Sequence, residues 1–271
     1  MKIPVSIIIS CYNQNKSVTK ITELLEAGSH SIQEVIIADD GSNPTLEETS
    51  ANLSSKRILK YIFLTHEDKG FRKCKILNEA IRRTTSDYIL FLDGDCLPHR
   101  HFVKDHIAMA EKGYFVQGRR CFINEKSVAP LLDSKTSLSK LIFSGKVSGL
   151  LKSSRFPLPI IKRNTSMYGI LGCNVGIWRD DLIAVNGFDE DFEGWGREDS
   201  DLGARLYNLG LQRKMVYGRA LVYHLNHPEN SKGNLDNNDK LLQNTLRSKK
   251  IQCSSGIKNI AQLKVNDGLY P

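Results

Sequence analysis

Long apolar runs are absent from this sequence. The longest, near Val5–Ile9 and Tyr88–Leu92, fall far short of the roughly 20 residues that a membrane-spanning helix needs, which excludes such a helix. The N-terminal stretch has one lysine and a short apolar segment but no small-residue cleavage site. We therefore expect it to form a first β-strand rather than a signal peptide.

Closely spaced cysteines are also absent. The six cysteines are scattered, and no two of them form a C-x-x-C pair. This spacing argues against a disulfide framework and against a zinc site. We expect reduced thiols and a cytoplasmic protein.

The charge is unbalanced toward the basic side, with 38 Lys and Arg against 30 Asp and Glu in 271 residues, a net charge of +8. Such a balance suits nucleic acid, an anionic membrane face or an acidic ligand. No helix-turn-helix, zinc-finger or RNP-type aromatic pattern accompanies it, so we expect no nucleic-acid partner. A membrane surface or a phosphorylated ligand is favoured.

Apolar strand patterns alternate with helical spacing over the first 120 residues. This alternation is typical of β-α-β units and predicts an α/β fold in three layers around a mixed, mostly parallel sheet. The expected strands are Ile3–Ser10, Glu34–Ala38, Ile58–Leu64 and Tyr88–Leu92.

Regular patterning is lost between Asn124 and Arg163. Within this stretch, Lys135–Arg163 carries seven Lys and Arg with interleaved leucines and no acidic residue. We expect an irregular insertion, which forms either a lid over an active site or a loop that contacts an acceptor or a membrane. The polar, lysine-rich residues beyond His227 predict a peripheral helix or a loose tail.

Asp93-Gly94-Asp95 directly follows a predicted buried strand, at the sheet edge where parallel folds gather ligands. Two carboxylates one residue apart suit a hard cation that also binds phosphate oxygens, although an ordinary Asp-Gly turn has the same residues. His224 ends a later apolar strand, with His227 three residues on. A neutral imidazole at His224 is a plausible further ligand.

Two other polar clusters are candidate binding sites. Asp39-Asp40-Gly41-Ser42 is either a solvated turn or a site for the donors of a nucleobase and ribose. Gly194–Asp201 places three carboxylates after a Gly-Trp-Gly run. A helix N-terminus explains one or two acids, but the flat indole ring beside carboxylates favours a sugar site.

Four motifs together resemble a known family. VSIIISCYNQ, IIADDGS and FLDGDC resemble the family-2 glycosyltransferases of GT-A fold, and GFDEDFEGWGREDSD resembles the C-terminal signature of β-1,4-galactosyltransferase-like enzymes. The resemblance covers roughly residues 3 to 228. It implies metal-dependent, inverting transfer of a hexose or N-acetylhexosamine, Gal or GalNAc favoured, from a UDP-sugar. The acceptor would be a hydroxyl of a glycan or a lipid-linked molecule in surface-polysaccharide synthesis.

The resemblance also implies residue roles. Asp199 would be the catalytic base, Trp195 and Glu198 would bind the acceptor, and Asp95 and His224 would bind manganese or magnesium. Nucleotide-sugar contacts would come from Tyr12, Asp39, Asp40, Arg72, Lys75, Asp93 and Gly94. Two positions depart from the galactosyltransferase motif: Arg197 stands where the motif has glycine, and Ser200 where it has aspartate. Because both lie in the acceptor site, acceptor identity does not carry over.

We therefore expect one GT-A domain over residues 1–228, followed by a polar extension, 229–271. Within the domain, 1–120 would bind the nucleotide-sugar, 121–167 would be an insertion or acceptor loop, and 168–228 would hold the acceptor and catalytic residues. The basic segment predicts reversible, peripheral association with the anionic inner membrane face.

Two alternatives of other classes stay open. One is a non-catalytic module of the same fold that binds nucleotide-sugars or glycans. The other is a sugar-nucleotide pyrophosphorylase, which usually needs a glycine-rich loop after the first strand, whereas CYNQNKS has no glycine.

Overall fold

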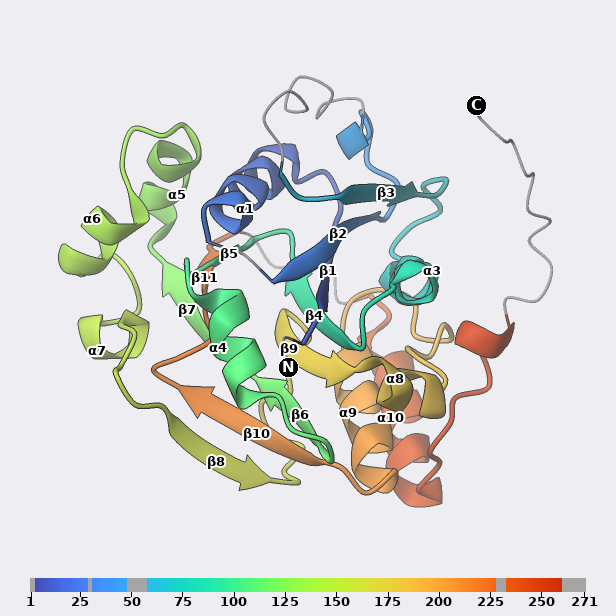
Figure 1. Ribbon diagram of the computed structural model, residues 1–271. Helices are drawn as coiled ribbons and strands as arrows, with labels where there is room; N and C mark the ends of the chain where they lie inside the picture. Colours follow the sequence, from blue (N-terminus) through green and yellow to red (C-terminus); the bar gives the residue numbers. More distant parts are fainter. Residues whose placement is uncertain (1–2, 29–30, 48–57, 228–232, 260–271) are drawn as a thin grey trace.

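The computed structural model describes residues 3–28, 31–47, 58–227 and 233–259 (Figure 1). An eight-stranded sheet in the order β3-β2-β1-β4-β9-β6-β10-β8 forms its centre. Its strands are β1 (Val5–Cys11), β2 (Ile32–Asp39), β3 (Tyr61–Thr65), β4 (Tyr88–Asp93), β6 (Tyr114–Gln117), β8 (Ile160–Asn164), β9 (Asn174–Trp178) and β10 (Gln212–Tyr217). Pairings β1–β2, β1–β4, β2–β3 and β6–β10 are parallel, and β4–β9, β6–β9 and β8–β10 are antiparallel. The predicted mixed, mostly parallel sheet is confirmed.

Helices cover both faces of this sheet, which explains why β1 is apolar at nearly every position and buried along its whole length. Side chains alternate between the faces of a strand. Ile7 and Ile9 of β1 accordingly pack with α1 (Asn15–Gly28), whereas Ile8 packs with α3 (Lys73–Arg83). Figure 1 shows these helices on opposite sides of the sheet. The predicted three-layer α/β fold is confirmed.

A second, three-stranded sheet lies beside the carboxyl end of β4. It comprises β5 (Cys96–Pro98), β11 (Leu221–Leu225) and β7 (Arg119–Ile123), in the order β5-β11-β7. In its register Cys96 pairs with His224, and the Leu225 N–H donates to the Asp95 carbonyl. This pairing brings the end of the Asp93–Asp95 motif next to a histidine from far along the chain.

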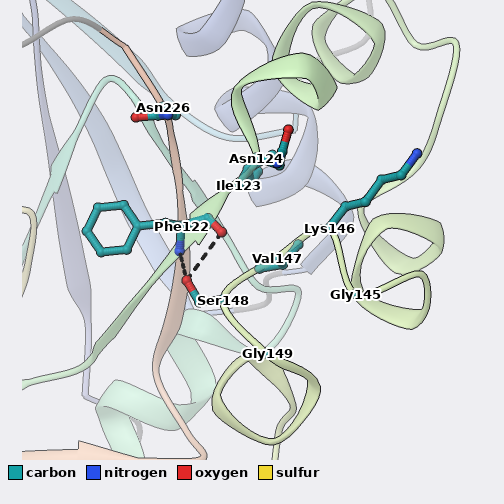
Figure 2. Close-up of a pocket in the computed structure, with 9 residues that line it drawn as sticks. All are labelled: Phe122, Ile123, Asn124, Gly145, Lys146, Val147, Ser148, Gly149 and Asn226. Carbon is teal, nitrogen blue, oxygen red and sulfur yellow. Dashed lines mark hydrogen bonds between the residues drawn. The ribbon is translucent and has the colours of Figure 1, made fainter.

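The prediction of an irregular segment over Lys135–Arg163 was wrong. The chain there forms α6 (Leu138–Phe143), α7 (Leu150–Ser153) and strand β8, after α5 (Glu125–Leu132). These elements are short and expose most side chains, so they leave no apolar period in the sequence. Although its side chains are mostly exposed, the segment is hydrogen-bonded to the rest of the domain. Figure 2 shows Ser148 bonded to the main chain of Phe122, where the segment runs along the edge of β7.

A buried carboxylate anchors the same segment. Asp105 of α4 (Phe102–Met109) is 1% exposed and accepts bonds from Arg155, with Nε to Oδ2 at 2.9 Å. Arg219 also donates to it, at 3.1 Å from Oδ1. Arg155 is therefore part of the packing and is not available to a membrane surface.

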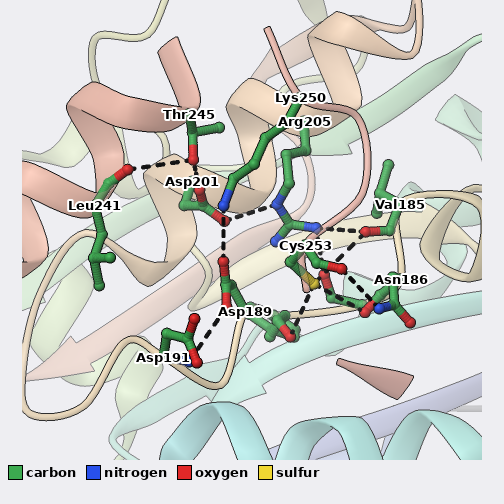
Figure 3. Close-up of polar contacts among 12 residues, drawn as sticks. Val185, Asn186, Asp189, Asp191, Asp201, Arg205, Leu241, Thr245, Lys250 and Cys253 are labelled. Atoms are coloured by element: carbon green, nitrogen blue, oxygen red, sulfur yellow. Dashed lines mark hydrogen bonds and ion pairs between the residues drawn. The ribbon is translucent and has the colours of Figure 1, made fainter. Parts of the chain in front are cut away.

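The last helices stack beside the sheet. They are α8 (Arg179–Ala184), α9 (Glu198–Asn208) and α10 (Leu235–Ser248), followed by the 3-10 turn η2 (Ile257–Asn259). A fully buried ion pair joins Arg205 Nε to Asp201 Oδ2 at 2.7 Å, and Thr245 of α10 donates to the same aspartate (Figure 3). Lys250 reaches Asp189 at 3.1 Å. Of the two expectations beyond His227, the described residues 233–259 have a helix, α10, which packs against α9; residues 228–232 and 260–271 lie outside the described part of the chain.

The sequence also predicts free cysteines and no membrane-spanning helix. All six cysteines are buried and free. In the part of the chain that the structure describes, no helix has the length and apolarity to cross a bilayer.

Candidate active site

A cavity of about 780 Å³ opens where β1, β2 and β4 end, and the small sheet and the start of α9 form its other walls. Loops at the carboxyl ends of parallel strands gather ligand-binding residues in such sheets. The residues from the sequence prediction that line it are Tyr12, Asp40, Asp93, Asp95, Trp195, Glu198, Asp199 and His224. Asp39, Arg72, Lys75 and Gly94 do not line it.

Asp95, His224 and His227 form a compact set of metal-ligand atoms, all within 4.8 Å of one another. The Nε2 atoms of His224 and His227 lie 3.4 Å and 2.9 Å from Asp95 Oδ2. Burial would raise the pKa of Asp95, but hydrogen bonds from the two histidines hold it well below its usual range. His224 Nδ1 is buried without a hydrogen-bond partner in the structure. One carboxylate and two imidazoles fit a divalent transition metal.

His227 is a member of this set that the sequence prediction did not assign. Its ring lies 5.2 Å from that of His224, although the two residues are three positions apart and β11 has already ended. The available signal was the His-x-x-His spacing just after a strand, because a chain leaving a strand can turn its next side chains back toward the same ligand.

Lys73 stands among carboxylates at the start of α3. Its Nζ lies 2.9 Å from Asp93 Oδ1 and 4.0 Å from Glu198 Oε1. Burial alone would lower the pKa of Lys73, but Asp93, Asp199 and Glu198 raise it well above its usual value, so the ammonium stays charged. The sequence prediction chose Arg72 and Lys75 instead, because it could not tell which face of the helix the basic residues occupy.

Glu198 and Asp199 begin α9. Burial first, and then the charge of Asp199, raises the pKa of Glu198 to about 7. Burial also raises the pKa of Asp199, against the opposing charge of Lys73. Asp199 Oδ2 accepts the N–H of Gly172 at 2.7 Å, which fixes its orientation. Carboxylates with raised pKa values in a cavity are typical of groups that accept protons near neutral pH.

The paired acids after β2 have different surroundings. The Asp39 carboxylate accepts bonds from its own turn, including the Ser42 N–H at 3.0 Å. Asp40 faces the cavity and lies 2.6 Å from His66 Nε2, while accepting the Arg72 N–H at 2.9 Å. Asp39 therefore stabilises the turn, whereas Asp40 is the one of the two acids that lines the cavity.

The other four predicted nucleotide-sugar residues, Tyr12, Arg72, Lys75 and Gly94, differ in position. The Arg72 guanidinium donates to the Glu67 carbonyl, and Lys75 is not among the residues that line the cavity. Gly94 packs too tightly for a side chain, because a Cβ there would lie 2.8 Å from that of Cys11. Tyr12 lies at the cavity mouth, where its hydroxyl donates to Asp68 at 2.9 Å.

Arg120 is a further cation in the cavity wall that the sequence prediction missed. Its guanidinium lies 4.9 Å from the centre of the Phe122 ring, which in turn packs edge-on against His224. Its Nε is buried and unpaired, and none of the ion pairs within the described ranges includes Arg120. Its Nη1 donates to Cys173 Sγ at 4.0 Å, and its positive charge opposes the raised pKa of Asp199, as that of Lys73 does.

Two family profiles match this chain, and together they include most of the residues that line the cavity. A family profile described as "Glycosyl transferase family 2" matches residues 6–182, and one described as "N-terminal domain of galactosyltransferase" matches residues 158–228. Chondroitin synthase of Escherichia coli is 28% identical over 242 residues, which are 82% of this chain and 35% of that protein. The chain spans about a quarter to a third of the length of the first curated relatives that it matches.

Solved structures share the fold. A structure of S. aureus TarS residues 1–349 has a TM-score of 0.61 at 18% identity and covers 89% of this chain and 64% of that one. GalNAc-T7, solved with UDP, GalNAc and Mn²⁺, has a TM-score of 0.59 at 12% identity, covering 84% of this chain and 44% of that one. The predicted GT-A fold is confirmed. Since the family profile spans well over half of the chain and its motifs line the cavity, this protein belongs to glycosyl transferase family 2.

Proposed function

We propose that this glycosyltransferase moves a hexose or N-acetylhexosamine, Gal or GalNAc favoured, from a UDP-sugar to a hydroxyl of a glycan or lipid-linked acceptor. The proposed reaction is inverting and metal-dependent. The observation that carries it is one cavity lined both by a compact metal-ligand set and by a carboxylate pair with raised pKa values. Surface-polysaccharide synthesis is the proposed setting.

The donor would enter at the ends of β1 and β2. Tyr12 offers a half-exposed aromatic ring and Asp40 offers an acceptor for the N–H groups of a base. TarS has been solved in complex with UDP and with UDP-GlcNAc, which supports a UDP-sugar here. The galactosyltransferase profile over residues 158–228 supports a Gal or GalNAc donor.

Asp95, His224 and His227 would hold the metal. Imidazole ligands suit transition metals better than magnesium, so the set favours Mn²⁺, and GalNAc-T7 was solved with that ion. When bound, the ion would supply positive charge to offset the negative charge that develops on the departing diphosphate. We assign Arg120, on the strand beside that of His224, the same task, because it lines the cavity and none of the described carboxylates forms an ion pair with it.

Asp199 would be the base. Its carboxylate would take the proton of the acceptor hydroxyl as that oxygen forms a bond to the anomeric carbon. The bond from this carbon to the phosphate oxygen breaks in the same step, and its electron pair leaves with UDP. One displacement inverts the anomeric configuration. The raised pKa of Asp199 increases its strength as a base near neutral pH.

The basic segment, Lys135–Arg163, would hold the protein at an anionic membrane face on the cytoplasmic side. Phe143, Leu151 and Leu158 are each more than three-quarters exposed there, and Lys140 and Lys152 are exposed beside them on α6 and α7. Apolar side chains among lysines suit an interface with anionic lipid. The six free cysteines support a reducing compartment.

A UDP-release screen tests the proposal. The protein would be given UDP-Gal, UDP-GalNAc, UDP-Glc and UDP-GlcNAc in turn, with Mn²⁺ or with EDTA, and a panel of glycan acceptors. We expect acceptor-stimulated UDP release with one donor class, lost in EDTA. Donor binding without release on any acceptor would favour the binding-module alternative. Release that EDTA leaves unchanged would contradict the metal assignment.

A further inference from the structure

Helix α10 begins after the last residue that either family profile matches, yet it contacts the loop that carries Trp195. Asn238 is fully buried, and its Nδ2 donates to the carbonyls of Glu193 at 3.0 Å and Gly196 at 2.9 Å. Asn234 Nδ2 also donates to Glu193, at 2.7 Å. Three hydrogen bonds, two from this helix and one from Asn234 just before it, therefore hold the main chain on both sides of the tryptophan.

The loop is shaped to lie against this helix. Gly194 and Gly196 have φ values of 73° and 107°, which favour glycine. A Cβ on Gly194 would lie 3.0 Å from that of Asn234, and one on Gly196 would lie 3.0 Å from Leu235 Cδ1. Leu235 also lines the cavity, so α10 supplies part of its wall.

Arg197 is the last residue of the loop and has a backbone conformation that non-glycine residues rarely adopt, with φ 78°. This is the position at which the galactosyltransferase motif has glycine. A non-glycine residue there is strained and persists only where its surroundings hold it. The Arg197 guanidinium forms an ion pair with Asp239 of α10. The helix thus contacts both the loop and the residue that departs from the motif.

We propose that α10 is a positioning element of the acceptor site: Asn238 and Asp239 hold the Gly194–Arg197 loop so that Trp195 faces the acceptor. The proposal rests on the proposed function in placing the acceptor at Trp195. It also accounts for Arg197, since the Asp239 contact stabilises a backbone conformation that glycine would adopt unaided.

A kinetic test compares Asn238→Ala with Asn237→Ala, because Asn237 is the exposed neighbour on the same helix. Loss of two hydrogen bonds to the loop should raise the acceptor KM about tenfold. The KM for the UDP-sugar should stay within about twofold, and Asn237→Ala should match the parent protein. Equal effects of the two substitutions, or an equal rise in both KM values, would overturn the proposal.

A second comparison isolates the ion pair. Asp239→Asn should raise the acceptor KM, whereas Asp236→Asn, an exposed position one turn earlier, should not. In an Arg197→Gly background the same Asp239→Asn change should have no effect, because glycine no longer needs the contact. An undiminished effect in that background would show that Asp239 acts elsewhere.

A fluorescence measurement tests the loop without any transfer reaction, so it stands even if the proposed function fails. Of the two tryptophans, Trp178 is 8% exposed and Trp195 is 37% exposed, so acrylamide quenching reports mainly on Trp195. Asn238→Ala should increase the quenching constant relative to Asn237→Ala at equal thermal stability. Identical constants would overturn the positioning role.

Discussion

Replacing Lys73 by methionine removes the cation that lies among the cavity carboxylates while keeping most of the side-chain volume. Its Nζ is 4.0 Å from Glu198 and 2.9 Å from Asp93. Two unit charges about 4 Å apart interact by about 4 kcal/mol at an effective dielectric constant of about 20. That energy corresponds to about 3 pH units as an upper limit, since one unit is about 1.4 kcal/mol.

The direction of the pKa change depends on whether the lysine favours the ionised or the protonated form of the carboxyl groups. Lys73 stabilises the ionised carboxylates, so its loss raises the pKa values of Glu198 and Asp199 further. A base is active only when deprotonated, so activity falls as pH decreases through the raised pKa. We expect the acid limb of kcat against pH to move about one to three units higher in Lys73→Met.

The assay is the UDP-release rate at saturating substrates over a range of pH. Lys75→Met is the matched control, because Lys75 lies on the same helix but outside the cavity lining. Its pH profile should match that of the parent protein. An acid limb that does not move in Lys73→Met, with the fold intact by circular dichroism, would refute the electrostatic reasoning.

Three further predictions follow from other parts of the molecule. His227→Ala should weaken Mn²⁺ binding at least tenfold in titration calorimetry, since it removes one of three ligands; unchanged affinity would exclude His227 from the site. Asp201→Asn should lower the free energy of urea unfolding by about 3 kcal/mol or more, because it leaves a buried arginine unpaired; a loss below about 1 kcal/mol would contradict that account. Lys140→Glu with Lys152→Glu should abolish salt-sensitive sedimentation with anionic vesicles, and unchanged sedimentation would assign the segment to another role.

The sequence was sufficient to predict the elements that are buried on both faces. β1 and β4 are nearly continuous apolar runs, because parallel strands between two helix layers meet no water. The acid clusters were predictable for a related reason: charged residues directly after such strands stand out and lie at the edge where ligands bind.

The sequence could not show which of several neighbouring residues lines the cavity, because that depends on how the chain folds in three dimensions. Asp39 and Asp40 are adjacent, and only the turn after β2 shows that one bonds its own backbone while the other faces the cavity. Lys73 stands between two other basic residues, and its assignment needs the orientation of α3.

Contacts between distant segments were equally hidden. Asn238 and Gly196 lie 42 positions apart, and no local pattern connects them. The short helices α6 and α7 were not predicted, because exposed elements of so few residues have no periodic apolar pattern.

The central claim is that Asp199 removes the acceptor proton in a transfer from a UDP-sugar. The most direct measurement is the turnover of Asp199→Asn alongside its affinities for UDP and Mn²⁺. The account predicts a loss of about 10²–10⁴ in kcat, with both affinities close to those of the parent protein. Turnover near the parent rate would contradict it.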